Sequence, residues 1–423
     1  MNIKDFLDGR HNCDCKKEHI CDIHYVEIGE GVLSKLREIC APFSRILLVA
    51  DGNTYPLCGK ETEDILSQKI VGKALFGKEI VIPNEEAIAY IESFMTEDTD
   101  FIVGIGSGVI NDLCKHVSFI HNIRYAIVAT APSMDGYASV GSALILDEMK
   151  VTLNARVPYA ILAESDALCT APIDMLRSGY GDIIGKYSCL NDWKLAHLIN
   201  GEYFCQFVYD TVMQTVKNTE NTAKSILERD KRAIQNLMEG LVTVGIMMSF
   251  VGNSRPASGS EHHLSHFFEI TGILNGTPYY LHGIDVLYAA AVTARLREEL
   301  LGMTPPFPPY VDDPSARNQH IKRIYQSASD GVIALQEKVG LYEAIDTSVF
   351  EEKWEQICDV LRDAPSYDTM LGYVKDIGLC MEDFLSFYGD GVIRDAVRYA
   401  KDLKDRYTVL WPCYALGINE ISF

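Results

Sequence analysis

The alternation of short apolar runs with segments of helical periodicity over the first 165 residues constrains the fold of this chain most. Residues 46–50 and 101–105 carry no polar side chain, which is typical of strands covered on both faces. Strands are expected at residues 25–28, 46–50, 79–82, 101–105, 125–129, 143–146 and 159–162, and helices at residues 31–40, 62–76, 84–95 and 109–120. This alternation predicts a parallel sheet with helices on both sides.

The sequence changes character after Asp166, where strand-like runs give way to long helical periodicities. A helix is expected to begin near Pro172, and others are expected at residues 203–216, 225–250, 282–301, 316–339 and 392–410. The proline-rich residues 304–309 are expected to form a loop. The chain is therefore predicted to be α/β, with a nucleotide-binding α/β domain at residues 1–165 and an all-helical domain at residues 166–423.

Charge and apolar content exclude several classes of protein. The chain has 423 residues, of which 48% are apolar, enough for a large core and too many for a disordered chain. A net charge of −21 repels phosphate backbones and anionic lipid, so neither nucleic acid nor membrane is an expected partner. The N-terminus lacks the apolar segment of a signal peptide, and the longest apolar run, residues 241–252, is shorter than the ~20 residues of a membrane span. The 12 cysteines are scattered along the chain, so we expect reduced thiols in the cytoplasm.

A glycine-rich loop follows the expected strand at residues 101–105. Gly106, Ser107 and Gly108 join this strand to a helix, whose N-terminus offers unpaired amide groups to a phosphate. The usual dinucleotide spacing of three glycines is absent, and no acid follows at the usual distance. Asp51, at the end of an earlier strand, is placed to meet a ribose hydroxyl instead. An ordinary tight turn between strand and helix explains the same residues.

The loop after the expected strand at residues 125–129 is rich in small polar residues. Thr130, Ser133 and Ser139 supply hydroxyls and Asp135 supplies a carboxylate. Loops at the carboxyl ends of parallel strands are where α/β proteins bind ligands, so this polar cluster is a candidate site beside the glycine loop. Pro132 and Gly136 also account for the segment as simple turns.

Three histidines and one aspartate form a candidate metal site. His262 and His266 are four residues apart and would share one face of a helix, whereas His263 would point about 100° away. His282 opens another helix, and Asp182 lies in a glycine-rich segment. One carboxylate and two imidazoles make a three-ligand site with open positions, as a catalytic divalent metal requires. Isolated histidines are also common in ordinary protein cores.

A second cluster of possible ligands lies near the N-terminus. Cys13, Cys15, His19 and Cys21 offer three thiols and an imidazole, which are the ligand types of structural zinc sites. Their spacing is irregular for a zinc finger, and terminal segments are often poorly ordered. Reduced cysteines close to solvent are the simpler interpretation.

Taken together, these motifs resemble those of the sn-glycerol-1-phosphate dehydrogenases, within the superfamily of iron-containing alcohol dehydrogenases, glycerol dehydrogenases and dehydroquinate synthases. The matching segments lie in the family's order between Asp51 and Gly283. They are residues 106–112 with Lys115, residues 130–136, 179–182, 192–196 and 254–262, and His282 with Gly283. The resemblance implies a Rossmann-like domain followed by an all-helical domain, with the active site in the cleft between them. Ser107 departs from the family pattern, which has glycine there.

The resemblance also implies roles for individual residues. Asp182, His262 and His282 match metal ligands, and these three together with His266 match the catalytic set. Asp135, Asp182 and His266 match substrate-binding positions. The positions that match cofactor-binding residues are Asp51, Gly106, Gly108, Val109, Ile110, Asn111, Asp112, Thr130, Ser133 and Ser139.

The activity that the resemblance implies is reduction of dihydroxyacetone phosphate to sn-glycerol 1-phosphate with NAD(H) or NADP(H) and one divalent metal. A ligand set of Asp and two His suits zinc, nickel or iron. Asp51 would repel a 2′-phosphate and so favours NADH. A homodimer is expected, because apolar helical surfaces often pair symmetrically.

Two other enzymes share these motifs. A dehydroquinate-synthase-like lyase needs a strongly basic site, which the few lysines in the motif regions disfavour. A glycerol dehydrogenase acting on unphosphorylated polyols is closer, although Met134-Asp135-Gly136 favours the phosphate enzyme. A protein that keeps the fold without the chemistry is disfavoured, because all three expected metal ligands are present.

Overall fold

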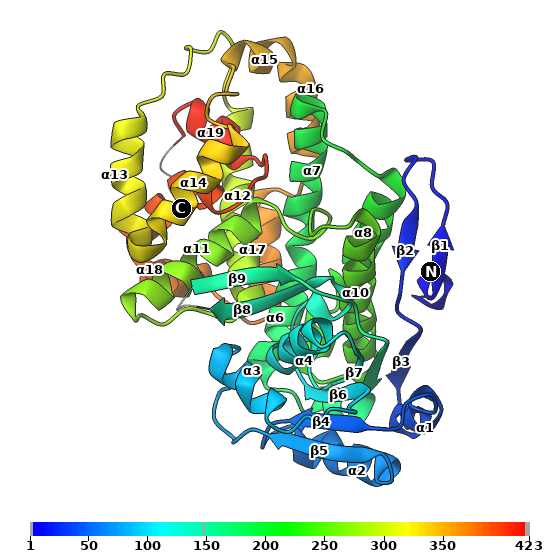
Figure 1. The fold of residues 1–423 in the computed structure, drawn as a ribbon. Helices are drawn as coiled ribbons and strands as arrows, with labels where there is room; N and C mark the ends of the chain where they lie inside the picture. The colour runs from blue at the N-terminus through cyan, green and yellow to red at the C-terminus, as the bar shows by residue number, and fades with distance from the viewer. Residues whose placement is uncertain (1–2, 147–148, 419–423) are drawn as a thin grey trace. The chain divides into compact units, whose positions relative to one another are not determined.

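The computed structural model describes residues 3–146 and 149–418 (Figure 1). The chain forms two compact units. The first unit comprises Met1–Ile183 and Lys224–Ser254, and the second comprises Ile184–Ala223 and Arg255–Phe423. The predicted boundary between binding domains after residue 165 stays a prediction, because a compact unit and a binding domain need not end at the same residue.

The first unit is built on a parallel sheet of six strands. The strands are β3 (Tyr25–Gly29), β4 (Ile46–Ala50), β5 (Ile70–Leu75), β6 (Phe101–Gly106), β7 (Arg124–Ala129) and β10 (Ala160–Glu164). Their spatial order is β3-β10-β7-β6-β4-β5, and every neighbouring pair is parallel. All residues of β4 and β6 are buried, as their continuous apolar sequence predicts. The predicted parallel sheet is confirmed.

Helices connect these strands and cover the sheet. They are α1 (Leu36–Ile39), α2 (Lys60–Leu66), α3 (Glu85–Glu92), α4 (Gly108–Ile120), α5 (Ser165–Cys169) and α6 (Ile173–Ile184), with α10 (Lys231–Val251) from the later segment of the unit. Short turns of other helix types are η1 (Ile3–Phe6), η2 (Val32–Lys35), η3 (Tyr55–Gly59) and η4 (Gly136–Ala138). The core on one side of the sheet packs Leu48, Val103 and Val128 against Leu36 and Ile39.

Two antiparallel hairpins accompany the main sheet. One pairs β1 (Gly9–His11) with β2 (His19–Cys21), and the other pairs β8 (Gly141–Leu146) with β9 (Met149–Asn154). The expected strand at residues 143–146 is the end of β8, which is confirmed. Strands β1, β2 and β9 carry no clear signal in the sequence, because β1 and β2 are only three residues long and β9 mixes charged and apolar residues.

Two expected elements of the first unit are wrong. The expected helix at residues 62–76 ends at Leu66, and the chain continues as the edge strand β5. Gly72 explains part of this change, because a Cβ atom there would lie 2.2 Å from the carbonyl oxygen of Phe94. Residues 79–82 form no strand, and Ile80 is 94% exposed. The β-branched residues there favour an extended backbone, but no neighbouring strand pairs with them.

The second unit is helical throughout its described residues, and no strand follows Glu164 in the part of the chain that the structure describes. This confirms the predicted fold class. Its helices are α7 (Lys186–Asn200), α8 (Gln206–Thr219), α11 (Ser260–Asn275), α12 (His282–Leu301), α13 (Pro314–Tyr325), α14 (Ser329–Val339), α15 (Thr347–Glu352), α16 (Trp354–Arg362), α17 (Tyr367–Asp376), α18 (Met381–Tyr399) and α19 (Leu410–Ala415). Helix α9 (Ala223–Leu227) spans the boundary between the units.

Helix α10 is the one element of the described residues that is long and apolar enough to cross a membrane. It has 21 residues with a mean hydropathy of 1.4, and 72% of its most apolar window is buried inside the protein. Its apolar surface is used in packing, because α10 lies against α5, β2 and η4 of the first unit. The helix is therefore an interior helix of this unit.

Candidate active site

The glycine-rich loop joins β6 to α4 as the sequence predicts. Ser107 is the N-cap residue of α4, and its side chain makes no capping hydrogen bond. Its backbone is extended, with φ −99° and ψ −154°, so a residue other than glycine fits at this position. Gly106 has a packing reason to be glycine, since a Cβ atom there would lie 2.6 Å from the side chain of Ile110. The first turn of this helix can therefore offer its amide groups to an anion.

Asp51 and Thr130 lie at the same edge of the sheet as this loop. They follow β4 and β7, the two strands that flank β6, and the registers Ala50 to Ile105 and Gly106 to Ala129 place all three ends together. The backbone amide of Thr130 donates to the Gly106 carbonyl at 3.1 Å. One Asp51 carboxylate oxygen accepts from the amides of Asn53 and Thr54, at 2.8 and 2.9 Å. The structure thus gathers these predicted cofactor residues at one sheet edge, and Asp51 also shapes its own turn.

Lysine 115 fixes the polar loop that follows β7. Its ammonium is fully buried and donates to the carbonyl oxygens of Gly136 and Gly141, both at 2.8 Å. The hydroxyl of Ser139 donates to the Gly136 carbonyl at 3.0 Å. Burial lowers the pKa of Lys115 from its ordinary value, and nearby Asp112 opposes that shift. Lys115 and Ser139 therefore shape the loop around Asp135.

The side chains of two predicted cofactor residues of α4 make hydrogen bonds within the protein. Asn111 is buried, and its amide oxygen accepts a hydrogen bond from the Tyr125 hydroxyl at 3.2 Å. One carboxylate oxygen of Asp112 accepts from the backbone amide of Ala143 in β8 at 3.3 Å. Residues 109 and 110 complete the first turn of the helix. Any contact of this turn with a phosphate would therefore use backbone amides.

Asp135 and Asp182 are joined by a hydrogen bond. The backbone amide of Asp135 donates to a carboxylate oxygen of Asp182 at 2.9 Å, and Asp182 is fully buried on α6. The approach of α6 to the loop depends on Gly179, where a Cβ atom would lie 1.8 Å from the Pro132 carbonyl oxygen. The hydroxyl of Ser178 donates to the Ser133 carbonyl at 2.9 Å. These contacts hold the loop of Asp135 against Asp182 of α6 within the first unit.

The three predicted histidines gather in the second unit. The ring centre of His262 lies 5.0 Å from that of His282 and 6.1 Å from that of His266, and the rings of His266 and His282 are 5.5 Å apart. His262 and His266 share one face of α11, as their spacing predicts, and His282 is the first residue of α12. The structure therefore brings the three imidazole rings together. The combined ligand set with Asp182 remains a prediction.

Glu261 orients the ring of His262. A Glu261 carboxylate oxygen lies 2.7 Å from Nδ1 of His262 and 2.9 Å from the backbone nitrogen of Gly259. Burial raises the pKa of Glu261, but the hydrogen bonds from His262 and from the Gly259 amide oppose burial, and the pKa is lower than usual. A carboxylate only accepts hydrogen bonds, so Nδ1 carries the proton and Nε2 keeps its lone pair. His262 is thus prepared to bind a cation through Nε2.

Asp192 fixes the start of α11. One of its carboxylate oxygens accepts from the backbone amide of Ser260 at 2.7 Å, and the other accepts from Arg297 at 3.0 Å. Gly259 lets the two segments approach, because a Cβ atom there would lie 2.6 Å from the Cα of Cys189. The motif at residues 192–196 thus has a structural role, since Asp192 anchors the helix that carries His262 and His266.

His263 takes no part in the cluster. It is fully buried, and neither ring nitrogen has a hydrogen-bond partner among the described residues. Burial, followed by the positive charges of Arg406 and Lys404, holds its pKa well below the ordinary value, so the ring is neutral. The prediction that His263 points about 100° away from the face of His262 stays a prediction.

Sequence reasoning missed Glu261 and Ser265. The hydroxyl of Ser265 lies 3.4 Å from Nδ1 of His282. Ser265 therefore contacts one ring nitrogen of His282, and the other nitrogen, Nε2, is the candidate metal ligand. Both residues were visible as polar neighbours of histidines within residues 260–266. Their adjacency in the chain was a usable signal, because a metal-binding imidazole usually has a hydrogen bond at its other nitrogen.

Comparison with known proteins identifies the class to which this fold and these residues belong. The family of iron-containing alcohol dehydrogenases matches residues 27–172. The solved sulfoacetaldehyde reductase of Bifidobacterium kashiwanohense, in complex with NAD+, has the same fold, with a TM-score of 0.63 and 12% identity over 96% of this chain and 98% of that one.

Closer relatives are glycerol-1-phosphate dehydrogenases [NAD(P)+]. The protein of Geobacillus thermodenitrificans is 32% identical over 66% of this chain and 69% of its own length. That of Halalkalibacterium halodurans is 30% identical over 67% of this chain and 73% of its own length. The chain belongs to the glycerol-1-phosphate dehydrogenase family and is an oxidoreductase.

Proposed function

We propose that this oxidoreductase reduces dihydroxyacetone phosphate to sn-glycerol 1-phosphate, using NADH or NADPH and one divalent metal. The observation that carries the proposal is the convergence of His262, His266 and His282, with Nδ1 of His262 held by Glu261, in a chain of this family. The names of the relatives, which specify glycerol 1-phosphate and NAD(P)+, support the substrate and the cofactor.

The metal would be held by Asp182, His262 and His282. One carboxylate and two imidazole nitrogens suit zinc, iron or nickel, and the protonated Nδ1 of His262 leaves Nε2 for the ion. When both are bound, the metal would act as a Lewis acid on the substrate carbonyl, and the nicotinamide would supply the hydride. Glu261 keeps His262 in the required tautomer and orientation.

The nucleotide would bind at the shared edge of β4, β6 and β7. The backbone amides of the first turn of α4 would bind its pyrophosphate. Because these amides attract an anion, an acidic protein can bind pyrophosphate without a cluster of lysines. Asp51 would accept a hydrogen bond from a ribose hydroxyl, and its charge would disfavour the 2′-phosphate of NADPH. Thr130, Ser133 and Ser139 would complete the nucleotide site with the remaining cofactor positions.

The chain's own residues would orient the substrate and move the proton. Asp135, whose loop is fixed by Lys115 and by Asp182, would accept hydrogen bonds from the substrate hydroxyl. His266, on the same helical face as His262, would give a proton to the oxygen that forms from the carbonyl. The protein has a net charge of −21, which repels the phosphate of this substrate. The phosphate would therefore be bound locally, by backbone amides or by single basic groups.

The test follows NADH oxidation by purified protein with dihydroxyacetone phosphate and, in parallel, with unphosphorylated dihydroxyacetone. We expect turnover with the phosphorylated ketone, loss of activity after chelation, and recovery after zinc, nickel or iron is added back. Preference for dihydroxyacetone would replace the proposal with a glycerol dehydrogenase. Turnover of a sugar-acid phosphate without net NADH consumption would replace it with a lyase. A cytoplasmic location and a homodimer remain part of this proposal.

A further inference from the structure

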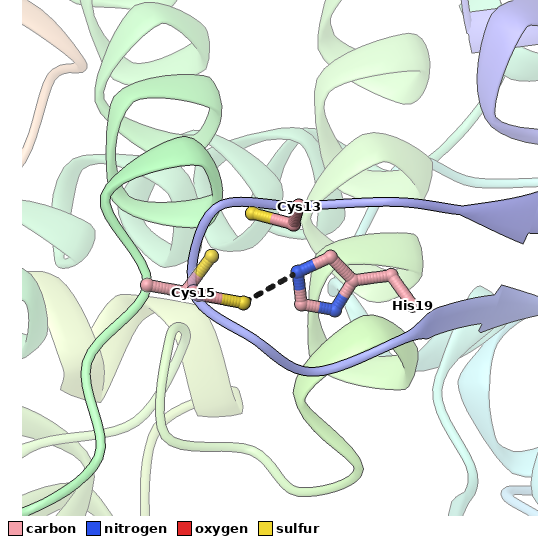
Figure 2. A group of neighbouring side chains, drawn as sticks. Cys13, Cys15 and His19 are labelled. Carbon is pink, nitrogen blue, oxygen red and sulfur yellow. Dashed lines mark hydrogen bonds between the residues drawn. The ribbon is translucent and has the colours of Figure 1, made fainter.

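A second group of metal-ligating side chains lies in the first unit and includes none of the residues with a role in the proposed reaction. It is formed by Cys13, Cys15 and His19 at the tip of the hairpin β1–β2 (Figure 2). One donor atom of each residue lies within 4.8 Å of the donor atoms of the other two. Figure 2 shows both thiols and the imidazole turned toward one another inside the same loop. We propose that these three residues bind a structural zinc ion.

The ring of His19 is already oriented to bind a cation. Nδ1 lies 2.9 Å from the backbone carbonyl oxygen of Phe250, which only accepts hydrogen bonds, so Nδ1 carries the proton. The ring is fully buried and stacks on the ring of Phe250, with centroids 5.1 Å apart and an interplanar angle of 8°. The lone pair of Nε2 therefore faces Cys15, whose sulfur is 3.4 Å away. A fixed Nδ1–H is the usual second contact of a metal-binding histidine.

The spacing of the donors fits one tetrahedral ion. Zn–S and Zn–N bonds of about 2.3 and 2.05 Å at the tetrahedral angle place sulfur and nitrogen about 3.6 Å apart. The distance of 3.4 Å between the Cys15 sulfur and Nε2 of His19 is close to that value. Two thiolates and one imidazole are soft enough to select zinc over magnesium or calcium.

The backbone of the hairpin brings the two cysteines to one side. The amide of Lys16 donates to the carbonyl of Cys13 at 3.2 Å, and Lys16 has a left-handed backbone with φ 66°. This turn folds Cys15 back toward β2, where His19 begins the strand. Cys21 lies outside the group, and burial raises its pKa to about 11, so it stays a neutral thiol. The four-residue cluster of the sequence is therefore reduced to three ligands.

An ion at this place would fasten the hairpin to α10. Phe250 lies in the last turn of α10 and holds His19 by both its carbonyl and its ring. One residue earlier, the hydroxyl of Ser249 donates to the Ala138 carbonyl of η4 at 2.8 Å. The proposed zinc therefore stabilises the end of the helix that supports the loop of Asp135. Its role is structural, since none of its ligands has a place in the proposed reaction.

Cobalt substitution tests the proposal on the intact protein. Thiolate ligands give Co²⁺ an intense charge-transfer band in the near ultraviolet, whereas a site of Asp and two His gives none. We expect the band in wild type and in His262→Ala, and its loss in the double variant Cys13→Ser with Cys15→Ser. Cys380→Ser is the matched control, because Cys380 is exposed and outside the group. It should keep the band, and metal analysis should show one zinc fewer in the double variant than in Cys380→Ser.

Several results would overturn the proposal. They are the absence of a charge-transfer band in cobalt-loaded wild type, a band that survives in the double variant, and a disulfide between Cys13 and Cys15 in protein purified under reducing conditions. If the double variant does not fold, X-ray absorption at the zinc edge of wild type decides the question. Sulfur neighbours at about 2.3 Å support the site, and a shell of nitrogen and oxygen alone refutes it. Failure of the proposed dehydrogenase activity would leave these spectra unchanged, so the two proposals can fail separately.

Discussion

The two histidine-containing clusters of this protein differ in how the protein holds the ring. In the second unit, the Nδ1 of His262 meets the carboxylate of Glu261, and its neighbours are imidazoles on two helices. In the first unit, the Nδ1 of His19 meets a backbone carbonyl, and its neighbours are thiols on a short hairpin loop. Both rings therefore carry their proton on Nδ1 and keep the lone pair on Nε2, but the groups that fix them differ in charge.

This difference separates two uses of a metal. A negative carboxylate behind an imidazole increases its basicity and can tune the ion, which suits a site that performs chemistry. A carbonyl behind the ring supplies orientation without charge, and two thiolates neutralise a divalent ion, which suits a closed site that holds structure. The following predictions test this division, starting with the largest expected effect.

Replacement of His262 by alanine should abolish turnover. Removing one ligand of the proposed metal costs the Lewis-acid stabilisation of the developing charge, and about 4 kcal/mol corresponds to about 10³-fold in rate. The measurement is kcat/KM for ketone reduction, with circular dichroism to verify the fold. Asp182→Asn should behave in the same way. Activity retained in either variant after metal stripping would remove the assigned role.

Replacement of Glu261 by glutamine should weaken metal binding while leaving a hydrogen bond to His262. Loss of the negative charge at such a second contact lowers metal affinity by about 10- to 100-fold. The measurement is activity as a function of free metal concentration, where the curve should shift to higher concentration and its plateau should recover. An unchanged curve would mean that charge behind the ring does not matter, and the comparison with His19 would lose its basis.

Replacement of both Cys13 and Cys15 by serine should lower thermal stability with little change in kcat at low temperature. A ligand present at 100 times its Kd stabilises a protein by about 2.7 kcal/mol, which corresponds to about 5 to 10 °C in the melting temperature of a domain of this size. The measurement is the melting temperature of zinc-loaded protein, with Cys380→Ser as the control. Equal melting temperatures for the two variants would argue against a structural ion.

Replacement of His263 by leucine should have the smallest effect. The ring is neutral and has no hydrogen-bond partner among the described residues, so an apolar side chain of similar volume costs less than about 1.5 kcal/mol. The measurement is kcat/KM beside that of His262→Ala, because the two residues are neighbours in α11. A large loss of activity in His263→Leu would show that any disturbance of this helix, and not the loss of a ligand, explains the first prediction.

Much of the fold could be predicted from local patterns. Strands β4 and β6 and helices α4 and α12 are found where the apolar runs and periodicities place them. Strand β5 was not predicted, because its residues continue the helical pattern of α2. The close approach of Gly72 to Phe94, which favours a strand there, depends on tertiary packing. Residues 79–82 show the opposite error, since local preference for extended backbone cannot supply a neighbouring strand.

In the candidate sites too, local patterns predict the features that depend on neighbouring residues, and they do not predict the contacts that depend on tertiary packing. The spacing of His262 and His266 reveals their common face, because four residues make about one helical turn. No local pattern brings His282 to them, nor the carbonyl of Phe250 to His19, since these contacts depend on tertiary packing. The contacts by which Lys115 and Asp112 fix neighbouring loops could not be predicted either. A sequence motif identifies the residues but not the atoms that they contact.

Gly179 has a consequence for attempts to alter the substrate of the proposed reaction. The space between its Cα and the oxygen of Pro132 admits only a hydrogen atom, so the distance between α6 and the loop of Asp135 is set by a single residue. Mutant libraries that vary residues 133–136 can change the side chains proposed to bind the substrate, but position 179 must stay unvaried. Any larger residue there would push the loop of Asp135 away from α6 and break the hydrogen bond between the Asp135 amide and Asp182.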